Sequence, residues 1–114
     1  MSINKEVLAA LKDIGIPVAF QTSKEKTYPY ITFFTYLDRT MQHADDGEMI
    51  TGYFIQIDIW SKTDYTEIEN EVHQSMLIAN FMKQRFHDLY EDDTKVNHKV
   101  MRFFKEVERW ANMD

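Results

Sequence analysis

The chain has 114 residues, of which 44% are hydrophobic and 28% are charged, with only three glycines and two prolines. This length and composition are typical of one folded domain and argue against low-complexity disorder. The net charge of −6 argues against general nucleic-acid binding, because such binders need a basic surface. The chain contains no cysteine, which excludes disulfides, thiolate metal sites and cysteine nucleophiles.

The first fifteen residues carry charges every few positions and hold no apolar run long enough for a signal peptide or a membrane span. We therefore expect a protein that folds in the cytosol and makes no contact with a membrane. Residues 3–14 predict a first helix, with apolar residues at helical spacing, Ser2 as the N-cap and Gly15 at the stop. A short strand over residues 18–20 and a polar loop over residues 21–29 follow.

Residues 30–40 and 50–60 predict two long strands, because both are rich in aromatic and β-branched residues. A turn centred on Asp46 and Gly47 joins them into a long antiparallel hairpin. The second strand alternates between two faces: the first holds Tyr53, Ile55, Ile57 and Ile59, and the second holds Phe54, Gln56, Asp58 and Trp60. Such alternation is typical of a sheet with one packed side and one semi-polar side.

Residues 63–86 predict the main helix, because apolar residues recur at helical spacing along one side of it (Tyr65, Ile68, Val72, Met76, Ala79 and Met82). Asp64 and Glu67 have the spacing of an N-terminal capping box. Further apolar residues in the second half predict burial there on more than one side (Leu77, Ile78 and Phe81).

Residues 89–100 predict a polar turn, and the tail from His98 to Trp110 fits both a strand and a helix, with the strand favoured. We therefore expect one α+β domain over residues 1–114. Its mainly antiparallel sheet has about four to five strands, including the long hairpin, and the helices pack on one face.

Candidate catalytic and metal-binding residues are few. The cluster His43–Glu48 supplies only a fragment of a calcium loop, so a solvated hairpin turn is the better interpretation. The serines lack the glycine-flanked setting of a nucleophile elbow, and three glycines cannot form a phosphate loop. A pair between His98 and Asp58 stays open, because nothing in the sequence places them together. We expect no catalytic residue, no cofactor and no metal.

Aromatic residues crowd the two long strands and the segment before them, in excess of what one helix-covered face can use (Tyr28, Tyr30, Phe33, Phe34, Tyr36, Tyr53, Phe54 and Trp60). Some of these rings can pack over each other across strands. An exposed aromatic surface favours self-association instead. The predicted interface residues are Tyr36, Asp46, Phe54, Gln56, Asp58 and Trp60.

The order of elements and two short runs resemble the small tail-completion or tail-terminator proteins of long-tailed phages and prophages. The first run, Asp58–Ser61, reads D-I-W-S and precedes the long helix. The second run lies in the last strand and the turn before it (Tyr90, His98, Arg102 and Phe103). The resemblance covers about residues 1–108, and its motifs indicate a fold more than a reaction.

The resemblance implies a non-enzymatic structural protein that forms a ring, usually hexameric, at the head-proximal end of the tail tube. Its partners would be the tail tube protein and the head connector protein, and DNA would pass through the ring without sequence-specific binding. Such a protein assembles in the host cytoplasm and ends in the virion tail. The alternatives are a head–tail connector adaptor and a small cytosolic ligand-binding or regulatory domain with the aromatic face as a pocket. An enzyme has the least support.

Overall fold

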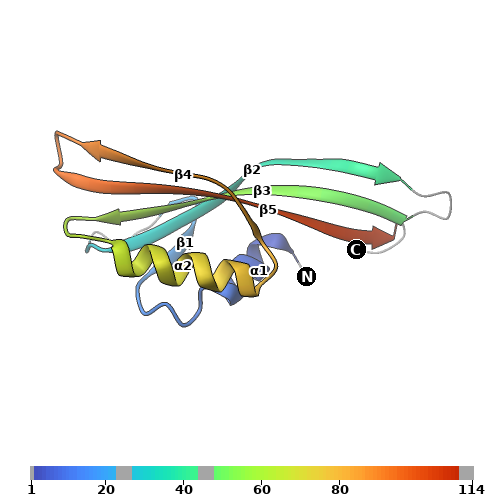
Figure 1. Ribbon diagram of the computed structural model, residues 1–114, viewed down its shortest axis with the longest axis horizontal. Coiled ribbons are helices and arrows are strands. Elements are labelled where there is room, and N and C mark those ends of the chain that lie inside the picture. Colours follow the sequence, from blue (N-terminus) through green and yellow to red (C-terminus); the bar gives the residue numbers. More distant parts are fainter. Residues whose placement is uncertain (1, 23–26, 44–47, 111–114) are drawn as a thin grey trace.

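The computed structural model describes residues 2–22, 27–43 and 48–110 and shows an α+β fold (Figure 1). Its elements are α1 (Ile3–Ala10), β1 (Val18–Phe20), β2 (Tyr30–His43), β3 (Glu48–Ser61), α2 (Thr66–Ile78), β4 (Met82–Glu91) and β5 (Val96–Trp110). Within the described ranges the strands form one five-stranded sheet in the order β1-β2-β3-β5-β4. β1 is parallel to β2, and the other neighbouring strands are antiparallel. The predicted fold class is confirmed.

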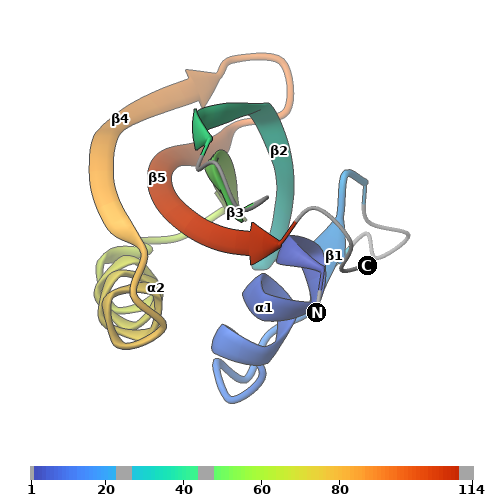
Figure 2. The same cartoon turned by 90° about the vertical axis from the view of Figure 1, so that its right-hand side faces the viewer.

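The core fills the space between one face of the sheet and the two helices, which lie on the same side of it (Figure 2). Ile55, Ile57 and Ile59 of β3 are completely buried, as are Met101 and Phe103 of β5. They belong to one cluster with buried residues of both helices and the segment after α1 (Val7, Leu11, Val72 and Met76). The predicted packing of the isoleucine row under the main helix is therefore confirmed. Burial of this apolar surface is the main favourable term in folding.

The predicted main helix is too long. α2 ends at Ile78, and Asn80 has a φ of 70°, a left-handed conformation that asparagine tolerates better than most residues. Ile78 is 81% exposed and Met82 is 55% exposed, whereas the prediction placed Met82 on the apolar side of the helix and expected Ile78 to be buried as well. Phe81, which follows Asn80, is buried as predicted, and the chain then continues as β4 from Met82.

The start of α2 also differs from the predicted capping box. Tyr65 occupies the N-cap position, and Asp64 Oδ1 accepts hydrogen bonds from the backbone N–H and the hydroxyl of Thr66. Asp64 therefore stabilises the helix start through Thr66, without the predicted pairing with Glu67.

The last third of the chain forms a second hairpin. The predicted polar turn is confined to residues 92–95, between β4 and β5. The tail is a strand, as favoured from the sequence, and it lies between β3 and β4 in the sheet. Its pairing with β3 runs from Ser61↔Asn97 to Glu48↔Trp110.

Two lysines of β5 attach the helices to the sheet. Lys105 Nζ donates to Glu6 Oε1 at 2.8 Å and to the Ala79 carbonyl at 2.9 Å, which ties β5 to α1 and to the end of α2. Lys99 Nζ lies 3.4 Å from Glu69 Oε1 of α2 and 3.2 Å from Asp88 Oδ1 of β4. Both lysine side chains are largely buried, so these ion pairs are screened less than surface pairs.

Tyr65 and Asp88 join the start of α2 to β4, because the tyrosine hydroxyl donates a hydrogen bond to Asp88. Burial, followed by this hydrogen bond, raises the pKa of Tyr65 well above its ordinary value. The same hydrogen bond is the main cause that lowers the pKa of Asp88.

The sheet extends furthest beyond the helices at the end where β2 finishes and β3 begins, and the molecule measures 53 × 23 × 23 Å (Figure 1). β4 begins at Met82, opposite Phe104, so only β2, β3 and β5 continue past this point. We call these three continuing strand ends the arm. Residues 44–47, which connect β2 to β3, lie outside the described residues.

Candidate assembly interface

The sheet face opposite the helices, here called the open face, holds most of the residues singled out from the sequence. Residues that pair across adjacent strands share a face. The register therefore places Trp60 beside His98, Gln56 beside Arg102, and Phe54 beside Phe104. All of them alternate with the buried isoleucine, methionine and phenylalanine residues of the core.

Five of the six predicted interface residues lie together on the open face: Tyr36, Phe54, Gln56, Asp58 and Trp60. Asp46 lies outside the described residues. Their exposure differs: Tyr36 is 36% exposed, Asp58 is only 4% exposed, and the other three are half-buried. Asp58 therefore belongs to the interior of this face, while Tyr36 belongs to its surface.

A hydrogen-bonded chain crosses the open face from β5 to β3 and back. Arg102 Nε donates to Gln56 Oε1 at 3.1 Å, and Gln56 Nε2 donates to Asp58 Oδ1 and Oδ2 at 2.9 and 3.2 Å. His98 Nε2 hydrogen-bonds Asp58 Oδ1 at 2.7 Å. The pairing of His98 with Asp58, which the sequence left open, is therefore present.

Aromatic rings cover this hydrogen-bonded chain. Trp60 stacks on His98 with ring centroids 3.8 Å apart, and Tyr30 stacks on Trp60 at 6.1 Å. Trp60 Nε1 donates to Thr32 Oγ1 at 3.0 Å, so the indole is fixed at both its ring and its polar atom. The stacked rings explain how Asp58 and His98 are buried on a face that no helix covers.

The Asp58–His98 pair joins a carboxylate to an imidazole, as in a hydrolase triad, but Asp58 contacts Nε2, whereas the carboxylate of a triad contacts Nδ1 and leaves Nε2 for the nucleophile. Among the described residues, moreover, no serine or threonine hydroxyl makes a hydrogen bond to His98. Both partners are at most 8% exposed, so the pair satisfies buried polar groups inside the protein. No cluster of three or more histidine, aspartate or glutamate residues suited to a metal occurs in the described ranges. The candidate cluster His43–Glu48 lies largely outside them.

Five large apolar residues form a band across the open face at the base of the arm. We call this set the apolar stripe: Tyr36, Leu37, Phe54, Phe104 and Met82. The ring centroids of Tyr36 and Phe54 lie 5.9 Å apart, those of Phe54 and Phe104 lie 4.7 Å apart, and Met82 pairs with Phe104. Leu37 is 43% exposed and Met82 is 55% exposed. The stripe thus crosses four strands and remains accessible in the single chain.

Arginines accompany the apolar stripe. The Arg102 guanidinium lies 4.6 Å from the centre of the Tyr36 ring, and that of Arg39 lies 6.0 Å from the Phe54 ring. Arg85, opposite Arg102 on β4, is exposed. This part of the open face therefore combines apolar rings with positive charge, although the whole chain carries a net charge of −6.

Sequence reasoning missed Leu37, Met82 and Phe104 as members of this surface. Phe104 could have been found, because strand alternation in the tail puts it on the face opposite Phe103. Leu37 reaches the open face through a register shift in β2, and Met82 had been assigned to the helix.

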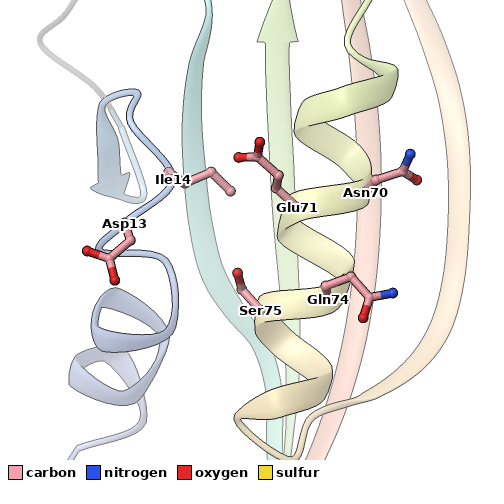
Figure 3. A pocket seen from close by; sticks show the side chains of 6 residues that line it. All are labelled: Asp13, Ile14, Asn70, Glu71, Gln74 and Ser75. Carbon is pink, nitrogen blue, oxygen red and sulfur yellow. The ribbon is translucent and has the colours of Figure 1, made fainter.

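The opposite side of the molecule carries a groove between α2 and the segment that follows α1 (Figure 3). Its volume is about 460 Å³, and its lining is Asp13, Ile14, Asn70, Glu71, Gln74 and Ser75. Glu71 and Ser75 point from α2 toward the α1 side (Figure 3). Neither Asp13 nor Glu71 forms an ion pair among the described residues, so the groove is an acidic surface.

No protein-family profile and no curated protein matches the sequence significantly. The structure is similar to a chain of the virion of a native gene transfer agent particle, with a TM-score of 0.68 and 9% sequence identity. The superposition covers 95% of this chain and 96% of that chain. At this identity the similarity shows a shared fold alone. Neither helix in the described ranges has the length and apolar character needed to cross a membrane.

Proposed function

We propose that this protein is a non-enzymatic structural subunit of a phage or prophage virion. The observation that carries the proposal is the fold, which is shared over 95% of the chain with a chain of a gene transfer agent virion. The interior of the open face supports a structural role, because its polar residues bond to one another and are shielded from solvent by aromatic rings.

Within the virion, we propose the role of a tail terminator that forms a ring, most simply a hexamer, at the head-proximal end of the tail tube. A ring of identical subunits needs two different patches on each subunit. The apolar stripe on the open face and the helix-bearing surface are two such patches on opposite sides of the sheet. The tail tube protein and the head connector protein would contact the two ends of the ring.

The acidic composition fits a ring through which DNA passes. A surface that bound phosphates tightly would hold the DNA, whereas acidic subunits repel it. The net charge of −6 per chain would be multiplied by the number of subunits in the ring. This charge supports passage of DNA and argues against sequence-specific binding.

Native mass spectrometry and negative-stain electron microscopy test the ring. We expect a closed oligomer of one size, present either at high concentration alone or after addition of purified tails. A chain that remains monomeric in both conditions would overturn the proposal.

Incubation with separated tails and heads tests the role. A terminator should be found by electron microscopy at one end of the tail tube, and it should stop further tube growth. Retention on heads with no effect on tails would replace the terminator role by that of a connector adaptor.

A further inference from the structure

The open face presents an apolar and a positive group at a fixed separation. Met82 of the apolar stripe and Arg85 both lie on β4, three residues apart. The register shift between Lys83 and Arg85 puts both side chains on the open face, because Met82 pairs with Phe104 and Arg85 pairs with Arg102. Their partners on β5 are two residues apart, so the two positions are separated by about 7 Å at ~3.3 Å per strand residue. The Arg85 side chain is exposed and forms no ion pair or hydrogen bond with the described residues. It is therefore a cation available to a partner, beside an apolar surface that is also available.

The outer surface of α2 presents the matching groups. Glu67, Glu71, Gln74 and Ile78 are all exposed and recur at helical spacing, so they lie along one line of the helix. Glu71 and Ile78 are seven residues apart, which corresponds to about 10 Å along a helix at ~1.5 Å per residue. The acidic groove that holds Asp13 adjoins Glu71.

The two surfaces are therefore complementary in charge and in apolar character. On the open face, Arg85 carries a positive charge that can pair with Glu71 and Asp13 of the acidic groove. The apolar side chains of Met82 and Phe104 can pack against Leu77 and Ile78 of α2. Leu77 is 43% exposed and Ile78 is 81% exposed, an unusual exposure for large apolar residues that adjoin one another. Burial of both sets in one contact would remove apolar surface from water on each side.

We propose that α2 of one copy docks on the open face of a second copy of this chain. Arg85 enters the acidic groove of its neighbour, and the neighbour's Leu77 and Ile78 cover Met82 and Phe104. This contact rests on the proposed ring. Because the two surfaces lie on opposite sides of the sheet, the contact is head-to-tail, which is the kind that closes into a ring.

Charge exchange tests the polar half of the contact. Arg85→Glu and Glu71→Arg should each lower the association constant at least tenfold, and the double variant should recover most of the loss. Lys95→Glu is the matched control, because it reverses one charge in the exposed turn between β4 and β5 and should leave association unchanged. Light scattering over a concentration series measures all four proteins.

Mixing two interface variants tests the head-to-tail geometry. Ile78→Asp disables the α2 surface and Met82→Asp disables the open face, and both sites are exposed enough for each variant to fold normally. Each variant alone should remain monomeric. An equimolar mixture should give a dimer and nothing larger, because each variant retains one working surface.

The outcomes separate this contact from the proposed ring. If the wild-type chain forms rings and the Ile78→Asp and Met82→Asp variants form them equally well, the ring stands and the contact is wrong. If these variants form rings but no longer cap tails, the surfaces belong to the tube contact, and this proposal is again wrong. A wild-type chain that never associates, with or without tails, overturns both. Thermal melting of each variant establishes that it is folded.

Discussion

Replacement of Asp58 by alanine should destabilise the isolated chain substantially. Asp58 is 4% exposed and accepts hydrogen bonds from Gln56 and from His98, which is 8% exposed. Loss of one partner of a buried polar pair costs about 1–3 kcal/mol for each donor left unsatisfied. Because the half-buried Gln56 amide can turn to water, we assign most of the loss to His98 and expect about 3 kcal/mol. This is a large part of the ~5–15 kcal/mol that stabilises a typical domain.

Urea unfolding followed by tryptophan fluorescence measures this change, at a protein concentration where the wild-type chain is monomeric. This condition is needed because self-association would add to the apparent stability. Asp93→Ala, in the exposed turn between β4 and β5, is the matched control and should change the free energy of unfolding by less than about 0.5 kcal/mol.

The double variant Asp58→Ala/His98→Ala completes a cycle with the two single variants. Its loss should be smaller than the sum of the single losses by at least about 1 kcal/mol, because no orphaned partner remains. A loss below about 1 kcal/mol for Asp58→Ala, or strict additivity in the cycle, would refute the argument that this pair stabilises the open face.

Three further predictions concern the helix-bearing side of the sheet. The pKa of Tyr65 is raised, so the free energy of unfolding should fall as the pH rises above the ordinary tyrosine value of 10.0, where the tyrosine ionises in the unfolded chain alone. In the Tyr65→Phe variant this decline at alkaline pH should be smaller. Urea titrations at pH 9–11 measure it, and an equal decline in both proteins would contradict the assignment. Lys105→Met leaves the Glu6 carboxylate without the ammonium group that lies 2.8 Å from it, so the free energy of unfolding should fall by about 1–3 kcal/mol. Urea titrations measure this change, and a loss under about 0.5 kcal/mol would contradict the prediction. Phe103→Ala removes a ring that is 0% exposed and should cost about 3–5 kcal/mol by calorimetry, whereas a loss under about 1 kcal/mol would show that the core collapses around the site.

The alternation of residues 53–60 predicted both faces of β3 correctly, because Ile55, Ile57 and Ile59 are completely buried under the helices, while the other face carries polar groups. The end of α2 was predicted wrongly because the apolar spacing continues through Met82 after the helix has ended. Asn80 was the available signal, since asparagine, after glycine, is the residue that most often adopts the left-handed conformation past a helix end. β4 itself gives a weak pattern, because a register shift between Lys83 and Arg85 breaks the two-residue period.

The residues of the open face were predicted only in part. Tyr36, Phe54 and Trp60 stood out by residue type alone. The contact between Asp58 and His98 joins residues 40 positions apart, and it depends on the register between β3 and β5. A local pattern carries no information about that register, so the sequence left the pair open.

The register shift between Thr35 and Leu37 has a consequence for solubility. At this bulge Tyr36 and Leu37 together oppose the single residue Phe54, and a second shift follows between Thr40 and Gln42. β1 pairs with β2 only at residues 31–33, so in the described chain the rest of β2 is an edge strand.

Bulges bend and twist an edge strand, which makes it a poor template for backbone pairing with another chain. The two bulges therefore protect this edge of the sheet against stacking of copies edge to edge into fibres. Contacts between copies along this edge are then made by side chains, so their strength can be altered one residue at a time.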